Sequence, residues 1–495
     1  MTYPRLSRTV IAAAVAATIL VPVSSVAEQV TIGQTFLASG LDPAKGSNGW
    51  ALVSHGIGEQ LFRVSRAGEV VPNLAASAKR NDDGTWTVEL APNRFFSDGT
   101  PVTAAVVAAA LNRTGAANPS ARATAGRLTF TPVGTGTLMV ETEQPTTILP
   151  SILAEWAFPV YRLSGDTPIF TGPFAVDSFE PGGSIEMSPN AHYIDAEARP
   201  NVTLRRIADG QSLALAFASD ELDMAFNLPV ETLKMLNATG KEVTSFPVSY
   251  QYMMWMNTRS PALSDRRVRR AIDLAVNRED LVTASQAGVP ASGAFARSYP
   301  FAAEEPLQHD PKKASELLDA AGWILGDDGV RRRDGARLEV VLYAYPQRPD
   351  LVTFQPVVRA ALAKVGIAVT TQVTESPSDV AASGEFDLFL WAQHTAPAGD
   401  PGLFLSLFFE TGAARNYSGW SNPEFDALIA NLRAEGNPKA RIDLARRAQE
   451  MIAAEAPVSF LVTPEWHVGL SSKLEGYALW GSDYYVIRPD LVLAR

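Results

Sequence analysis

The 495-residue chain contains no cysteine. This absence excludes disulfide bonds, thiolate metal sites, cysteine catalysis and a lipid attached to an N-terminal cysteine. Histidine is scarce as well, and none of the five histidines stands near another at the spacing of a zinc site. The sequence also lacks the H-E-x-x-H, P-loop and G-x-S-x-G patterns of common enzyme sites. We therefore expect a protein that is not an enzyme and that holds no intrinsic cofactor.

Positive charge is in short supply. The chain has 42 Lys and Arg against 53 Asp and Glu, which gives a net charge of −11. Such an acidic chain is poorly suited to nucleic acid or to an anionic membrane surface, and we expect neither as a partner. A hydrophobic content of 46% and a charged content of 19% are ordinary for a globular protein, and the length allows two or three domains.

Long apolar runs are absent beyond the N-terminus. There, Arg5 and Arg8 precede an apolar run over residues 10–23, and small residues follow at 25–27. This order of segments is typical of a cleavable secretory signal peptide. A membrane anchor is the alternative, but the run is too short to span a bilayer comfortably. We predict a signal peptide at residues 1–27, a mature chain of net charge −13, and release into the periplasm.

The clearest local pattern lies in residues 71–113. An Asn-Asp-Asp-Gly turn at 81–84 precedes alternating polar and apolar residues at 85–90, which predict a half-buried strand. A second turn is followed by Thr103, which can cap a helix over residues 104–112. The unit holds no nucleophile, base or metal cluster.

The same stretch carries a family pattern. It reads VPNLA at 71–75, DDGTWTVEL at 82–90 and FSDGTPVTA at 96–104. Further segments follow in order: TGPF at 171–174 with Asn190 and Tyr193, SDRRVRRAI at 264–272, and DPKKASELLDAAGW at 310–323. Together these segments resemble the solute-binding proteins of peptide- and nickel-type ABC importers, over nearly the whole mature chain.

The resemblance implies an α/β fold, and the alternation of predicted strands and helices favours the same class. We expect a two-lobed periplasmic binding protein of type II, with an extra small subdomain and a ligand cleft between the lobes. Lobe I is predicted at 28–245, with the inserted subdomain at about 73–165, and lobe II at 246–462. Residues 463–495 are predicted to return to lobe I. The implied partners are a small-molecule or peptide ligand and the membrane permease of an ABC importer, and we expect a monomer.

Positions at the cleft are also implied by the resemblance. They occur in the loop near residue 48, after the central strand at 386–391, in the loop after residue 409, and in the strand near residue 467. The candidate ligand-binding residues are Asn48, Trp50, Trp391, His394, Thr395, Arg415, Tyr417, Trp466 and His467. His467 is the candidate metal ligand, because neutral imidazole suits nickel and could complete the coordination of a metal held by a chelator. The alternative is that these residues are surface or core residues without a ligand.

The ligand class rests on a departure from the peptide-binding relatives. Those relatives carry an aspartate that anchors the peptide amine four residues before a proline, whereas this chain has Pro397 there, before Asp400-Pro401. We therefore favour a nickel chelate or another metal–metallophore complex, with nickel possible only as part of that ligand. A dipeptide or oligopeptide is the alternative. Nickel-type relatives often use an arginine in a P-R-P segment that is missing here, and Arg162 or Arg415 could replace it.

Two other patterns have plainer interpretations. Met253, Met254 and Met256 could bind a soft metal such as Cu(I), but methionine commonly fills irregular cores, and we predict a buried strand over residues 248–257. Four arginines in a predicted helix over residues 264–284 could bind an anion, but nearby acidic residues favour a solvated, ion-paired helix face.

Overall fold

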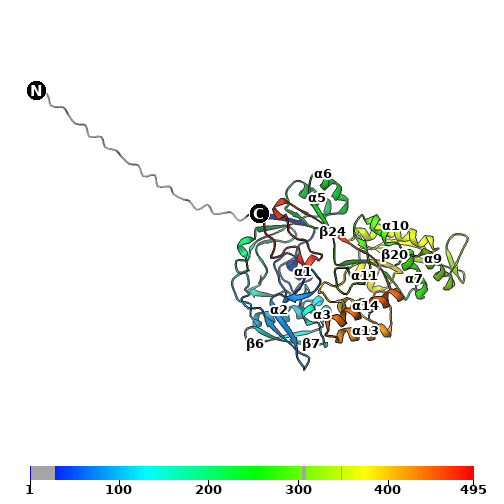
Figure 1. Cartoon of the computed structure of the whole chain (residues 1–495), viewed down its shortest axis with the longest axis horizontal. Helices are drawn as coiled ribbons and strands as arrows, with labels where there is room; N and C mark the ends of the chain where they lie inside the picture. The colour runs from blue at the N-terminus through cyan, green and yellow to red at the C-terminus, as the bar shows by residue number, and fades with distance from the viewer. Residues whose placement is uncertain (2–27, 304–307, 347, 495) are drawn as a thin grey trace.

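The computed structural model describes residue 1 and residues 28–303, 308–346 and 348–494. It shows two bodies side by side, and the C-terminal end of the chain lies with the first of them (Figure 1). Apart from residue 1, the predicted signal peptide at residues 1–27 lies outside the described residues. Within the described part of the chain, no helix has the length and apolar character needed to cross a membrane.

A seven-stranded mixed sheet forms the base of the first lobe. Strand β1 (Gln29–Gln34) runs parallel to its two neighbours. Its Val30 and Ile32 are fully buried on either side of the half-buried Thr31, and the strand ends in buried residues. The strand that the C-terminal segment adds, β24, is antiparallel to both of its neighbours. The sheet order is β10 (Phe174–Glu180), β11 (Ser184–Pro189), β12 (Asn201–Arg206), β1, β13 (Met224–Ala225), β24 (Glu465–Leu470) and β14 (Val243–Pro247). The short helices α5 (Gly210–Ala218) and α6 (Leu233–Ala238) pack beside it through a separate apolar cluster.

A four-stranded antiparallel sheet carries the pattern found at residues 71–113. The predicted strand is β5 (Trp86–Leu90), and its Trp86, Val88 and Leu90 are buried. The predicted helix is α2 (Ala104–Ala117); Thr103 stands at its N-cap position, but its side chain accepts no capping hydrogen bond. The sheet order is β4 (Ala75–Arg80), β5, β7 (Thr137–Thr142) and β6 (Leu128–Val133), with α3 (Pro119–Ala125) and α4 (Leu149–Ile152) nearby in the chain. Smaller elements complete this lobe: α1 (Asn48–Ser54), the pair β2 (Phe62–Val64) and β3 (Val70–Pro72), and the pair β8 (Tyr161–Ser164) and β9 (Thr167–Phe170).

A six-stranded sheet forms the centre of the second lobe. Its order is β16 (Val289–Pro290), β23 (Val458–Thr463), β15 (Tyr250–Met256), β22 (Leu388–His394), β20 (Glu339–Ala344) and β21 (Ala368–Val373). Strand β15 is the predicted buried strand, and Met253, Met254 and Met256 are all fully buried in the core. Their side chains therefore fill the core beside Trp255, as the plainer interpretation predicted.

Helices surround this second sheet (Figure 1). They are α7 (Arg266–Ala275), α8 (Arg278–Ser285), α9 (Pro311–Ala320), α10 (Pro349–Lys364), α11 (Pro377–Ser383), α12 (Pro401–Phe409), α13 (Pro423–Ala434) and α14 (Pro438–Glu455). The single helix predicted over residues 264–284 is wrong: Asn277 caps a second helix, so the chain bends between α7 and α8. A small sheet of β17 (Ile324–Leu325), β18 (Arg331–Arg333) and β19 (Ala336–Arg337) lies between α9 and β20 in the chain.

The chain crosses between the two large sheets at two neighbouring places. One crossing joins β14 to β15 through residues 248 and 249, and the other joins β23 to β24 through Pro464. A backbone hydrogen bond of 3.0 Å from the Val248 amide to the Pro464 carbonyl ties the two crossings together. Paired crossings of this kind are natural hinges between lobes. The domain limits expected from the sequence stay a prediction.

Candidate ligand-binding site

A cavity of about 490 Å³ lies between residues of the two lobes. The first lobe contributes the loop before α1, the segment after α4 and the C-terminal segment. The second lobe contributes β15, the ends of β20 and β22, and α12. The residues used below that line the cavity are Trp50, Glu155, Trp156, Tyr250, Tyr345, Arg348, His394, Thr395, Pro397, Asp400, Phe408, Arg415, Asp483 and Tyr484.

Aromatic side chains form much of the cavity wall. Tyr250 begins β15, and its ring centroid lies 5.0 Å from that of His394. Tyr484 approaches the same histidine from the C-terminal segment, with centroids 5.7 Å apart. Trp50 and Trp156 come from the first lobe. Such rings can pack against a planar or apolar ligand group while few polar groups fix its orientation.

Two guanidinium groups line the cavity from the second lobe. Arg348 lies 5.4 Å over the ring of Tyr250, and Arg415 lies 5.7 Å over the ring of Phe408. Among the described residues, neither side chain makes a hydrogen bond or an ion pair. A guanidinium presents a fork of donors that matches a carboxylate, so both groups can bind an anionic part of a ligand.

Two carboxyl groups line the cavity from the first lobe. Burial raises the pKa of Glu155 to about 7 and that of Asp483 to about 6. Tyr250 donates a 3.2 Å hydrogen bond to Oδ2 of Asp483, but Oδ1 has no hydrogen-bond partner among the described residues. Asp483 can therefore accept a hydrogen bond from a ligand.

His394 is the imidazole at the cavity. Burial lowers its pKa to about 3, so the ring is neutral near neutral pH. Its Nε2 lies 3.4 Å from Oγ of Ser482, whereas Nδ1 has no hydrogen-bond partner within the described chain. Neutral imidazole with an uncommitted nitrogen is a competent ligand for nickel. Thr395, the next residue, also lines the cavity and leaves its hydroxyl without a partner in the described part of the chain.

Four of the nine candidate residues thus line the cavity: Trp50, His394, Thr395 and Arg415. The other five lie outside this lining in the structure. Asn48 is buried and bonded to Ser39 and to the carbonyl of Asp42. Trp391 and Tyr417 pack against one another on the core of the second lobe, with centroids 5.4 Å apart.

Trp466 and His467 belong to β24 in the first lobe. Trp466 packs edge-on against Phe226 within the apolar core. His467 is 5% exposed, and its Nδ1 lies 2.7 Å from Oγ of Ser245 on the neighbouring strand. His467 is not among the residues that line the cavity, so the structure gives no support to His467 as a metal ligand. Its role stays a prediction.

The loop at residues 397–401 has the turn expected of its Asp-Pro pair. Asp400 accepts a 2.8 Å hydrogen bond from the Gly402 amide and caps α12. Its other oxygen forms a 2.5 Å ion pair with Arg441, and both side chains are nearly buried. Asp400 is therefore committed within the protein. Arg162, the other arginine proposed to bind a chelate, is also committed, because it forms an ion pair with Asp98.

Sequence reasoning missed Glu155, Arg348 and Asp483. Their segments are far apart in the chain, and no local pattern indicates that they meet. The one available signal was composition: Asp483 is followed by two tyrosines, and Glu155 by a tryptophan. Among the described residues, no group of three or more histidine, cysteine, aspartate or glutamate side chains could hold a metal ion. A metal bound here would have to arrive with most of its ligands.

The sequence and the structure were compared with those of known protein families and solved structures. Residues 69–416 match the family model of bacterial extracellular solute-binding proteins, family 5 (middle). The chain belongs to this family. The predicted family and the two-lobed α/β fold are confirmed, and so is the prediction that the protein is not an enzyme, because family 5 proteins are solute-binding proteins of ABC importers.

Family 5 relatives of this chain bind different ligands, according to their names. The oligopeptide-binding protein AppA of Bacillus subtilis is 28% identical over 63% of this chain, a match that spans 59% of that protein. The nickel-binding protein NikA of Staphylococcus aureus is 22% identical over 88% of this chain and 89% of its own. The crystal structure of a nickel ABC transporter from Bacillus halodurans superposes with a TM-score of 0.81 at 26% identity, over 93% of this chain and 99% of that one.

Proposed function

We propose that this family 5 protein is the periplasmic binding subunit of an ABC importer for a nickel chelate or a related metal–metallophore complex. Closure of the two lobes about the crossings at residues 248–249 and 464 encloses the ligand. The closed protein then docks on a membrane permease, and other subunits of the importer hydrolyse ATP. The protein itself catalyses no step.

His394 is the observation that carries this proposal. It is the one neutral, buried imidazole that lines the cavity within the described chain, and its Nδ1 is uncommitted. Nickel(II) readily accepts imidazole nitrogen alongside the nitrogen and oxygen donors of an amino-acid chelator. One protein nitrogen is enough when the chelator supplies the remaining ligands, which agrees with the absence of a larger metal-binding cluster among the described residues.

The two free guanidinium groups support the same ligand class. Chelators of nickel carry carboxylates, and Arg348 and Arg415 offer hydrogen-bond donors to them in the cavity between the lobes. The tyrosine and tryptophan rings provide flat walls for the chelate. Pro397 stands where the resembled peptide carriers have the carboxylate that anchors an amine.

A peptide is the second candidate, and Asp483 favours it. Asp483 lines the cavity, and its buried, unpartnered Oδ1 is a candidate acceptor of a hydrogen bond from the amine of a di- or oligopeptide. The guanidinium groups would then hold the peptide carboxylate. The two candidates therefore differ in whether His394 or Asp483 dominates the affinity.

Isothermal titration calorimetry of the mature protein separates these candidates. The titrants are Ni²⁺ with two equivalents of L-histidine, Ni²⁺ alone, and a panel of dipeptides. We expect binding of the nickel–histidine complex, with His394→Gln and Arg415→Gln each weakening it at least about tenfold, since each loses a charge-assisted or coordinate bond. The control is Arg433→Gln, which removes an exposed ion pair with Glu410 away from the cavity.

The result that contradicts the nickel proposal is binding of dipeptides, abolished by Asp483→Asn and unaffected by His394→Gln, with no heat from the nickel complex. That outcome would select the peptide carrier instead. The proposed location is tested separately by N-terminal sequencing of the protein from the periplasmic fraction. We expect the mature chain to begin at Glu28 and to elute as a monomer.

A further inference from the structure

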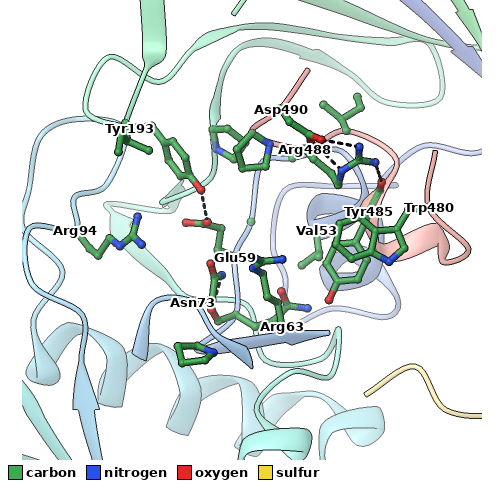
Figure 2. Close-up of a pocket in the computed structure, with 18 of the residues that line it drawn as sticks. Val53, Glu59, Arg63, Asn73, Arg94, Tyr193, Trp480, Tyr485, Arg488 and Asp490 are labelled. Carbon is green, nitrogen blue, oxygen red and sulfur yellow. Dashed lines mark hydrogen bonds and ion pairs between the residues drawn. The ribbon is translucent and has the colours of Figure 1, made fainter. Parts of the chain in front are cut away.

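A second cavity, of about 410 Å³, lies within the first lobe. It shares no lining residue with the cavity between the lobes. Figure 2 shows Tyr193, Glu59 and Arg94 around one end of it, and Trp480, Arg488 and Asp490 at the other. Arg63 and Asn73 also line it. The cavity is thus rich in charged side chains, and part of its lining, including Arg66 and Asp490, is exposed to solvent.

Glu59 is the buried carboxyl group of this cavity, with 8% of its surface exposed. Tyr193 donates a 2.8 Å hydrogen bond to Oε1. The other oxygen, Oε2, has no hydrogen bond in good geometry within the described residues, although Thr171 and Asn73 are near enough to help lower the pKa. Burial has the larger effect and raises the pKa of Glu59. A buried carboxylate oxygen without a donor is costly, so a bound donor would relieve it.

The four arginines of the cavity fall into two pairs. Arg488 is held by a 3.0 Å ion pair with Asp490, and Arg66 donates a 3.0 Å hydrogen bond to the Ala478 carbonyl. These two arginines are committed to the C-terminal segment.

The side chains of Arg63 and Arg94 have no such partners within the described residues. In the described chain, neither forms an ion pair or a side-chain hydrogen bond, and neither closes an ion pair with Glu59. Arg94 is still close enough to lower the pKa of that carboxyl. Two uncommitted guanidinium groups therefore line the cavity, and a carboxylate oxygen without a donor lies buried in its wall. Together they suit a ligand with an anionic group and a hydrogen-bond donor.

We propose that this cavity is a second ligand site, for a small carboxylate that carries a hydrogen-bond donor on the neighbouring carbon. The ligand carboxylate accepts hydrogen bonds from Arg63 and Arg94, and its hydroxyl or amino group donates to Oε2 of Glu59. A neutral hydroxyl group on the ligand fits better than a positively charged ammonium group. The reason is that the cavity has more arginines than acidic residues and would repel a further positive charge. The site is independent of the ligand between the lobes, so either assignment can fail alone.

The test compares L-lactate with propionate, which is the same carboxylate without the hydroxyl group. Each is titrated by calorimetry into the mature protein, and inorganic phosphate serves as a third probe. We expect L-lactate to bind one site at least about tenfold more tightly than propionate, since only lactate donates to Glu59. Arg63→Gln and Arg94→Gln should each weaken lactate at least about tenfold, while both variants still bind the nickel–histidine complex as the unmodified protein does. Glu59→Gln should erase the advantage of lactate over propionate.

Three results would overturn the proposal. The first is the absence of lactate binding at millimolar concentration. The second is lactate binding that is lost in Arg415→Gln but kept in Arg63→Gln and Arg94→Gln, which would place lactate between the lobes. The third is phosphate binding as tight as lactate binding, which would make the site a general anion site. Because Arg63 and Arg94 are tested separately and are only partly buried, a folding failure in one variant leaves the other as the test.

Discussion

Replacing Asp483 by asparagine should stabilise the ligand-free protein at alkaline pH. Burial raises the pKa of this carboxyl from 3.8 to about 6, so the folded protein resists its ionisation. A shift of about two pKa units corresponds to about 3 kcal/mol between the two protonation states. Asparagine keeps an oxygen that can accept the hydrogen bond from Tyr250, but it carries no charge.

The sign of the pH dependence follows from the direction of the shift. Because the folded-state pKa lies above the unfolded value, the folded protein binds more protons between those two values, and its stability falls as the pH rises through that window. Of the total of about 3 kcal/mol, about 2 kcal/mol is lost between about pH 4.5 and about pH 8. Asp483→Asn should therefore raise the free energy of unfolding, relative to the unmodified protein, by about 2 kcal/mol more at pH 8 than at pH 4.5.

The assay is urea unfolding followed by tryptophan fluorescence at the two pH values. Glu155, whose pKa is also raised, is present in both proteins, so its effect cancels in the comparison. The matched control is Asp166→Asn, in the exposed turn between β8 and β9, for which we expect no such difference. A change in stability that is the same at both pH values, or a loss of stability at pH 8, would refute the reasoning.

Three further predictions concern a buried ring, a buried ion pair and a histidine outside the cavity. Trp255→Ala should lower the free energy of unfolding by about 3–5 kcal/mol, because the ring is fully buried and stacks on Phe408 at 5.8 Å; urea unfolding measures this, and a loss under about 1 kcal/mol would contradict it. Arg441→Met should cost about 3–5 kcal/mol by leaving Asp400 buried without its partner, and the double variant with Asp400→Asn should recover part of that loss in the same assay. His467→Ala should leave the affinity for the nickel–histidine complex within about twofold in calorimetry, since His467 lies outside the cavity; a tenfold loss would restore it as a metal ligand.

Local patterns predicted those elements whose burial repeats along the chain. Strand β5 was predicted from its alternating polar and apolar residues. Strand β15 was predicted from its continuous apolar run, and the structure explains that run by placing the strand inside the second sheet. The bend between α7 and α8 was missed, because the apolar stripe continues past Asn277 and hides the cap. The spacing of apolar residues indicates which face of a helix is buried, but it does not indicate where the helix ends and the chain changes direction.

The cleft was only partly predictable, because its residues come from separate segments. His394, Thr395, Arg415 and Trp50 were reached through the family resemblance. Asp483 was not, since only the folded chain brings its segment to the cavity. In β24 the four central residues, 466–469, are all buried, so alternation could not indicate whether His467 faces the ligand or the interior.

Native mass spectrometry of the mature protein, purified from the periplasm of its own host, tests the central claim most directly. The account predicts a bound mass with the isotope pattern of nickel and the additional mass of an organic chelator, lost in His394→Gln. A mixture of peptide masses without metal would contradict it and would assign the protein to the peptide carriers of family 5.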